Sequence, residues 1–333
     1  VVIRPLLALL LLLTAAASLP VAAAAESEDA PPRYAHVRVL DFEGSIGALL
    51  AAYVGRQLEA AKTDGVDCLV LRIESPGGTV LHSMKIGDAL VELPSSIHVV
   101  AWIPSEAYSG AAFVALGCDE IVMGPHAHLG DAQPGTMDPT NGGWKKAGEK
   151  MESPLRAKVR GYAQANGYPV ALCEAMVSEH IEVLRVRDPA GQDHFVAGEA
   201  YRNADDRAEL VPGVDKAQLV QVGSPVVSEG ELLTLTSEEA ADLGFLARTF
   251  EGGQRFPASE SALLDDLSAD GARVDDIGLT FSESASRRLL QIAGILSAIV
   301  ALGLIVTMWQ GVGTMTIVGA IALVLTILIL SLI

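Results

Sequence analysis

Strand-like and helix-like patterns alternate along the first half of the chain. Residues 37–42 alternate apolar and polar side chains, and 68–73 and 98–103 are short apolar runs rich in branched residues, both typical of strands. Between them, the spacing of apolar positions in 46–61 and 80–93 predicts helices. Strands that alternate with helices predict an α/β fold with a mainly parallel sheet and crossover helices.

The pattern changes after residue 135. Residues 136–150 are rich in Gly, Asn and Lys and predict a mobile loop. Helical spacing returns at 155–165 and 170–178, and 185–236 predicts short strands and turns. A Thr-Ser pair followed by two acids predicts that a helix begins within 236–239.

The amino-terminal 25 residues predict a secretory signal peptide. Arg4 supplies a short positive region, Leu6–Leu13 form an unbroken apolar run, and small residues follow, with a cleavage site near Ala24 or Ala25. The apolar run is too short for an ordinary membrane-spanning helix. An uncleaved anchor is the alternative.

The carboxyl-terminal end contains two uncharged stretches, 289–309 and 312–333. Each has about the 20 residues that cross the hydrocarbon core, so two antiparallel transmembrane helices are predicted, with a buried helix pair of a soluble core as the alternative. A cleaved signal places the middle of the chain on the extracytoplasmic side of the cell membrane, although Arg287 and Arg288 favour the opposite orientation. The predicted organisation is a signal peptide at 1–25, a linker at 26–36, one domain at 37–250, a polar tether at 251–286 and two transmembrane helices within 287–333.

Charge and cysteine content argue against nucleic-acid binding and against a metal site. The formal net charge is −18, and an acidic chain without a basic patch is repelled by phosphates, which excludes nucleic-acid binding. Cys68, Cys118 and Cys173 are far apart in apolar contexts, so we expect buried free thiols and no metal site.

Two small-residue turns follow two of the predicted strands. Residues 74–78 read Glu-Ser-Pro-Gly-Gly, and 107–112 read Ala-Tyr-Ser-Gly-Ala-Ala. Loops after parallel strands gather at one edge of a sheet, where a Gly-Gly turn exposes backbone N–H groups that can stabilise an oxyanion. Ser109 stands at the start of a helix. Taken singly, the motifs also fit a tight turn and an N-cap serine.

Together the motifs resemble the membrane-bound serine proteases of the ClpP class, of the NfeD type, within the ClpP/crotonase superfamily. The order of SPGG, YSGAA and CDEIVMGPHAHLG carries the resemblance, with LLTLTSEEAADLGFLA at 232–247, and it covers about 37–250. It implies a ClpP/crotonase-like fold and a serine endopeptidase that cleaves apolar segments of membrane proteins. The implied partners are other copies of the chain and stomatin- or flotillin-like membrane proteins, and no metal or organic cofactor is implied.

The resemblance also assigns roles to residues. Ser109 stands at the nucleophile position, Gly78 and Gly110 at the oxyanion-hole donors, and Gly77 in the turn that shapes the hole. It implies a Ser–Lys dyad, but Arg160 occupies the expected position, and arginine does not deprotonate in proteins.

Several other residues are candidates for the general base. Lys158 lies two positions from Arg160 and would need a local shift of the helix, because i,i+2 residues point to different faces. Further candidates outside that helix stretch are Lys145, Lys146, Lys150, His126 and His128. The histidine of soluble ClpP proteases falls near Gly130, so a Ser-His-Asp triad is not supported.

Two other functions compete with an active protease. One is a catalytically impaired ClpP-like scaffold in membrane-protein quality control, motivated by Arg160. The other is a crotonase-like enzyme acting on acyl-CoA, which an acidic exported domain disfavours.

Overall fold

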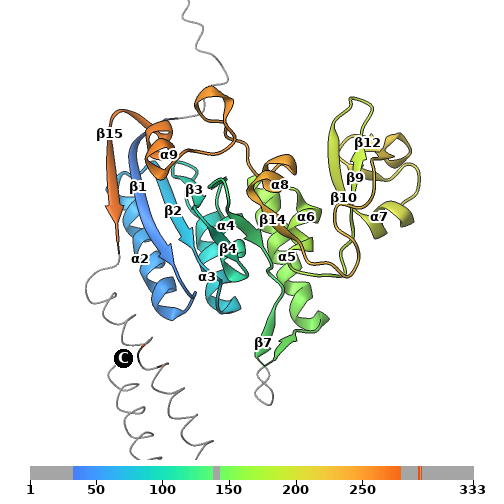
Figure 1. Cartoon of the computed structure of the whole chain (residues 1–333), viewed down its shortest axis with the longest axis horizontal. Helices are drawn as coiled ribbons and strands as arrows, with labels where there is room; N and C mark the ends of the chain where they lie inside the picture. The colour runs from blue at the N-terminus through green and yellow to red at the C-terminus, as the bar shows by residue number, and fades with distance from the viewer. Residues whose placement is uncertain (1–32, 138–142, 279–291, 293, 295–333) are drawn as a thin grey trace, which may run out of the picture. The chain divides into compact units, whose positions relative to one another are not determined.

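A five-stranded parallel sheet forms the centre of the molecule, in the order β15-β1-β2-β3-β5 (Figure 1). The computed structural model describes residues 33–137, 143–278, 292 and 294, all within one compact unit that begins at Arg33. The strands are β1 (Tyr34–Glu43), β2 (Cys68–Glu74), β3 (His98–Ile103), β5 (Glu120–Met123) and β15 (Ser268–Ile277). The α/β fold with a mainly parallel sheet is therefore confirmed.

Alternating side chains of the strands feed two cores. Leu69 and Leu71 of β2 join the larger core, which is covered by α2 (Ala48–Asp64), α3 (Val80–Val91) and α4 (Gly110–Leu116). Cys68 and Val70 point to the opposite face and join a smaller core under α9 (Glu260–Leu267). The period of two along each strand thus gives the sheet two buried faces, as parallel sheets require.

The segment expected as a polar tether, 251–286, contains both α9 and β15. Leu263 and Leu267 of α9 are fully buried, and β15 pairs in parallel with β1. The Tyr53 hydroxyl donates to the carbonyl of Ile277 at 2.6 Å, and Arg72 pairs with Glu260. Polar composition here reflects an edge strand held by ion pairs.

A second, three-stranded sheet stands beside the central one. It consists of β4 (Glu106–Tyr108), β6 (His128–Gly130) and β14 (Thr234–Thr236), in the order β14-β6-β4. The helix that follows, α8 (Ser237–Asp242), begins with a capping box in which Thr236 and Glu239 bond each other's backbone. The helix start predicted within 236–239 is confirmed.

The expected loop at 136–150 contains regular structure at both of its ends. Strands β7 (Gly135–Met137) and β8 (Trp144–Lys146) pair as a hairpin, and α5 (Glu149–Asn166) follows directly and leads to α6 (Val170–Ala175). The hairpin is closed by the Ala147 N–H, which donates to the Pro134 carbonyl at 2.8 Å. Backbone pairing between the two arms makes a hairpin from a sequence whose composition is typical of a loop.

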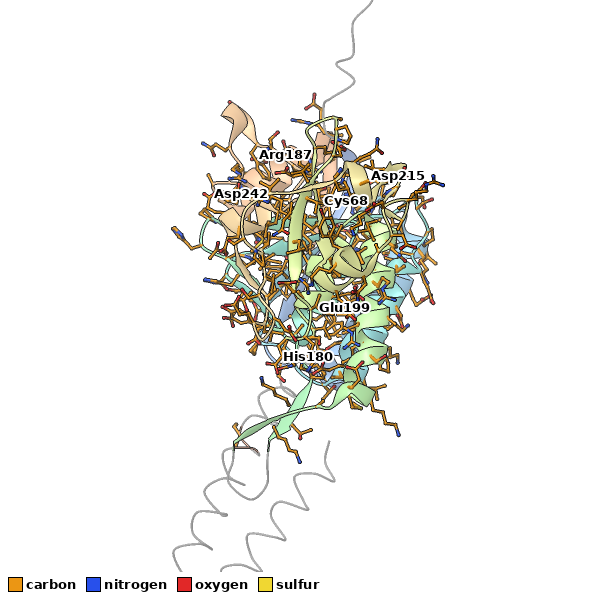
Figure 2. All side chains as sticks on the ribbon, turned by 90° about the vertical axis from the view of Figure 1, so that its right-hand side faces the viewer. Cys68, His180, Arg187, Glu199, Asp215 and Asp242 are labelled. Atoms are coloured by element: carbon orange, nitrogen blue, oxygen red, sulfur yellow. The ribbon has the colours of Figure 1, made fainter. Side chains whose placement is uncertain are left out.

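Residues 183–221 form a small lobe with its own core. It contains β9 (Val183–Arg187), β10 (Asp193–Ala197), α7 (Gly198–Asn203), β11 (Glu209–Val211), β12 (Val214–Asp215), a 3-10 turn at Lys216–Gln218 and β13 (Val220–Gln221). Figure 2 faces this lobe, with Arg187 of β9 and Asp215 of β12 labelled. Its interior is built by Leu184, Val186 and Val196 with neighbouring apolar side chains, which agrees with the predicted short strands.

The predicted signal peptide lies outside the described residues, as do both predicted transmembrane stretches apart from residues 292 and 294. Within the described ranges, no helix has the length and apolar character needed to cross a membrane. The three cysteines are free and buried, as expected.

Candidate active site

The two turns singled out in the sequence lie side by side at the carboxyl end of β2. The turn at 75–79 follows β2, and β4 leads into Ser109. The Tyr108 N–H donates to the Ser75 carbonyl at 3.1 Å, and the Ser75 N–H donates to the Glu106 carbonyl at 3.2 Å. These bonds join the glycine turn to the residue directly before Ser109.

Ser109 has an unusual backbone conformation, with φ 53° and ψ −122°. A positive φ costs a non-glycine residue energy and is found chiefly where the surrounding structure enforces it, often at functional sites. Ser109 occupies the N-cap position of α4, as the alternative interpretation expects, but its side chain makes no capping hydrogen bond to the helix. Its N–H donates to the Gly130 carbonyl at 2.9 Å, and the partly exposed hydroxyl has no partner within the described ranges.

Gly77 brings the first turn into contact with Ser109. Its φ of +92° lies in the region that favours glycine, and a Cβ placed on it would lie 2.5 Å from the Ser109 Cβ. The same Cβ would lie 2.8 Å from the Tyr108 carbonyl oxygen and from the Gly110 nitrogen. Only glycine therefore allows this approach.

The backbone N–H groups of Gly78 and Gly110 lie close to each other beside Ser109. A Cβ on Gly110 would be 3.4 Å from the Gly78 nitrogen and would overlap the hydroxyl of Ser83. In the described part of the chain, neither N–H has a hydrogen-bond acceptor. A serine hydroxyl flanked by two unpaired N–H groups can attack a carbonyl carbon and stabilise the oxyanion that forms.

Lys158 is engaged elsewhere on the structure. Its Nζ donates to both carboxylate oxygens of Asp88, at 2.7 and 2.8 Å, and the Tyr162 hydroxyl donates to the same carboxylate at 2.7 Å. Burial opposes ionisation of Asp88, but the bonds from Lys158 and Tyr162 outweigh it and the pKa of Asp88 lies below its ordinary value. These bonds direct Lys158 Nζ at Asp88, whereas a general base must reach the proton that it abstracts.

Arg160 is also held by a carboxylate. Its Nε donates to Glu174 of α6 at 3.0 Å, and its side chain is half exposed. The structure therefore brings Ser109, Gly77, Gly78 and Gly110 together, but it joins neither Lys158 nor Arg160 to Ser109 by a hydrogen bond.

The remaining candidates for the general base lie on β8, on α5, and on β6 or directly before it. Lys146 of β8 pairs with Glu179, Lys145 and Lys150 are exposed on β8 and α5, and His126 is exposed before β6. His128 packs near Tyr108, with 6.1 Å between ring centroids. None of these side chains shares a hydrogen bond with Ser109 in the ranges that the structure describes.

Three polar residues at the site have no role in the sequence-based prediction. Asp131 has a positive φ of 48° and follows Gly130, the acceptor of the Ser109 N–H. Burial raises the pKa of Tyr108, with smaller contributions from the charges of Glu106 and Asp131. Ser75 was part of the SPGG motif, but its side-chain bonds depend on a segment 31 residues away. No group of three His, Cys, Asp or Glu that could hold a metal occurs among the described residues.

Comparison with protein families and with curated proteins identifies relatives of the chain. A family model described as the N-terminal domain of NfeD1b matches residues 36–204. Membrane protein NfeD1b of Bacillus subtilis is 28% identical over 292 residues, which is 87% of this chain and 55% of that protein. Putative protease slr0021 of Synechocystis is 32% identical over 83 residues, 25% of this chain and 30% of that protein. The chain thus spans about half the length of the first relative and less than a third of the second.

Comparison with solved structures supports the fold. A mutant of 1510-N, a membrane-bound stomatin-specific protease, in complex with a substrate peptide, has a TM-score of 0.53 and 17% sequence identity. The likeness covers 76% of this chain and 96% of that one, and 1510-N comes from Pyrococcus horikoshii. At this identity the likeness shows that the two chains share a fold.

Proposed function

The chain belongs to the NfeD1b N-terminal domain family, and we propose that it acts as a membrane-anchored serine endopeptidase with Ser109 as the nucleophile. The observation that carries the proposal is the strained backbone of Ser109, whose side chain makes no capping hydrogen bond and which lies beside the unpaired N–H groups of Gly78 and Gly110. The fold shared with the stomatin-specific protease 1510-N and the similarity to a putative protease support the same reaction class.

The proposed reaction proceeds through an acyl-enzyme. Ser109 Oγ attacks the carbonyl carbon of a peptide bond, and the N–H groups of Gly78 and Gly110 donate to the oxyanion. The general base takes the proton of the Ser109 hydroxyl during this attack. Collapse of the tetrahedral intermediate breaks the C–N bond, and the base passes the same proton to the leaving amine. Water then releases the acyl group from Ser109. A Lys-type base completes the scheme, and Lys158 is the nearest lysine in sequence to the position that the resemblance assigns.

The proposed setting is the extracytoplasmic face of the cell membrane. The predicted spans 289–309 and 312–333 would anchor the protease domain there, and the Bacillus subtilis relative is named a membrane protein. The proposed substrates are apolar segments of membrane proteins. Stomatin- or flotillin-like proteins are proposed as partners because 1510-N is described as stomatin-specific. Further copies of this chain are also proposed as partners, from the family resemblance.

The second candidate is a catalytically impaired scaffold of the same fold. It is favoured by one observation, namely that Lys158 and Arg160 each pair with a carboxylate and not with Ser109. A scaffold would assemble in the membrane without hydrolysing peptides.

Labelling with a fluorophosphonate probe tests the proposal on the full chain in detergent micelles. We expect the probe to label the wild type and Ser109→Ala to remove the label. Lys158→Met should slow labelling by at least about 100-fold if Lys158 is the base. Lys62→Met is the matched control, because Lys62 of α2 also pairs with a carboxylate, that of Glu59, and is not a candidate for the base, so this variant should leave the rate unchanged. Absence of labelling in a folded wild type would favour the scaffold.

A further inference from the structure

Ser75 joins three segments that build the candidate site. Its backbone carbonyl accepts the Tyr108 N–H, which ties it to the strand that carries Ser109. Its hydroxyl donates to the Gly44 carbonyl at 2.6 Å, in the connection between β1 and α2. The same oxygen accepts the Gly77 N–H at 3.1 Å. Ser75 is fully buried, so its side chain is available only for these contacts.

The hydroxyl of Ser75 fixes the start of the glycine turn. The Gly77 N–H is held by Ser75 Oγ, and the Gly77 carbonyl accepts the Ile46 N–H at 2.9 Å. Both ends of Gly77 are thus anchored. Because glycine is the most flexible residue in a chain, this anchoring removes motion that the turn would otherwise have.

Anchoring Gly77 determines the direction of the Gly78 N–H. The Gly77 carbonyl and the Gly78 N–H belong to one planar trans peptide and point in opposite directions. Since the carbonyl points at Ile46, the N–H points away from Ile46, on the side where Gly110 approaches the Gly78 nitrogen. The bond from Ser75 holds the preceding peptide, Pro76–Gly77, through the Gly77 N–H. Without it, Gly77 would be anchored on one side only, and the turn could shift and move the Gly78 donor away from the oxyanion.

We propose that Ser75 is a positioning residue of the oxyanion hole, whose hydroxyl orients the Gly78 N–H relative to Ser109. The inference rests on the proposed function. Ser75 does not contact the Gly78 N–H itself. It acts on this donor through the backbone of Gly77, whose N–H its hydroxyl accepts. A displacement of about 1 Å in a reacting group can cost about 100-fold in rate, and loss of one oxyanion donor costs a similar amount or more.

The test compares Ser75→Ala with Ser237→Ala in the full chain. Ser237 is the matched control because it is also buried, donates to a backbone carbonyl and accepts the Ala127 N–H at 2.9 Å, but it contacts none of the turn residues. Both variants should lower the thermal midpoint by similar amounts. Only Ser75→Ala should slow fluorophosphonate labelling of Ser109, by about 10- to 100-fold, and lower kcat for peptide hydrolysis with KM nearly unchanged.

A cysteine variant keeps the test decisive if Ser75→Ala does not fold. Ser75→Cys retains a weak donor and acceptor in nearly the same volume, and it should be labelled at a rate between those of the wild type and Ser75→Ala. In that case Ser75→Cys is compared with Ser237→Cys, and slow labelling confined to the former supports the role.

Two results would overturn the inference in distinguishable ways. Labelling of Ser75→Ala, or of Ser75→Cys in its place, at the wild-type rate would remove the positioning role and leave the proposed function intact. A folded wild type that is not labelled would remove the proposed function and this inference with it.

Discussion

Replacing Gly77 by alanine tests how closely the glycine turn packs against Ser109. The added Cβ would lie 2.5 Å from the Ser109 Cβ and 2.8 Å from the Tyr108 carbonyl oxygen. Real Cβ atoms do not approach other atoms so closely, and both neighbours are fixed by the backbone. The turn and Ser109 must therefore separate in this variant.

Two costs contribute to the expected loss of stability. An alanine held at φ +92° costs about 1–2 kcal/mol relative to glycine. Overpacking against backbone atoms adds about 1–3 kcal/mol. The sum is about 2–5 kcal/mol, and at roughly 2–4 °C per kcal/mol for a domain of this size the thermal midpoint should fall by about 4–20 °C.

Gly191→Ala separates the two costs. Gly191 has a similar φ of +86°, but a Cβ there would meet no atom within 4 Å. It lies between β9 and β10, away from the glycine turn. This control should lose only the conformational part, about 1–2 kcal/mol, and it should keep the wild-type rate of Ser109 labelling.

Thermal unfolding of the full chain and the rate of fluorophosphonate labelling provide the two readouts. Gly77→Ala should lose more stability than Gly191→Ala and should be labelled far more slowly, because the separated turn no longer places its donors beside Ser109. Equal losses of stability in the two variants, with normal labelling in both, would refute the close approach of Gly77 to Ser109.

Three further predictions concern stability. Thr236→Ala removes the N-cap of α8 and should lower the free energy of unfolding by about 1 kcal/mol in chemical denaturation. The Arg248 side chain is only 3% exposed and pairs with two carboxylates. Arg248→Met leaves both carboxylates without this partner and should lower the free energy of unfolding by about 3–5 kcal/mol in the same assay. Hydrogen bonds from His36 and Arg273 lower the pKa of Asp275 to about 2, so its stabilising contribution is complete above a pH of about 4 and is lost as the pH falls through about 2. Thermal midpoints between pH 5 and pH 2 should therefore fall more for the wild type than for Asp275→Asn.

The strands of the central sheet could be predicted where burial imposes a pattern. Residues 68–73 and 98–103 are apolar because both faces of β2 and β3 are covered, and the structure extends these ranges by at most one residue. β15 has no such pattern, because it is an edge strand whose polar residues are held by ion pairs with β1 and β2. Its parallel pairing with β1 joins residues more than 230 positions apart, and no local signal in the sequence encodes such a contact.

In the candidate site too, features with a local sequence signal could be predicted, and features that depend on distant segments could not. Ser109 and its neighbouring glycines could be predicted because small residues in turns after strands are a local signal. The strained φ of Ser109 and the bonds of Ser75 could not, since they depend on segments that meet only in the folded chain. The same holds for the pair of Lys158 and Asp88, which lie 70 positions apart on α5 and α3.

The choice between an active protease and a scaffold therefore depends on α5 and its partners. The backbone around Ser109 has the same geometry under both proposals, because the strain and the unpaired N–H groups arise from the turn and from β4. What differs is whether a neutral amine can reach Ser109 Oγ. Asp88 holds Lys158 by two hydrogen bonds, yet the pair is solvent-accessible, with the Lys158 side chain 41% exposed. Exposed ion pairs are worth only about 0–1 kcal/mol, so the energy needed to release Lys158 is small compared with the several kcal/mol that a general base contributes to catalysis.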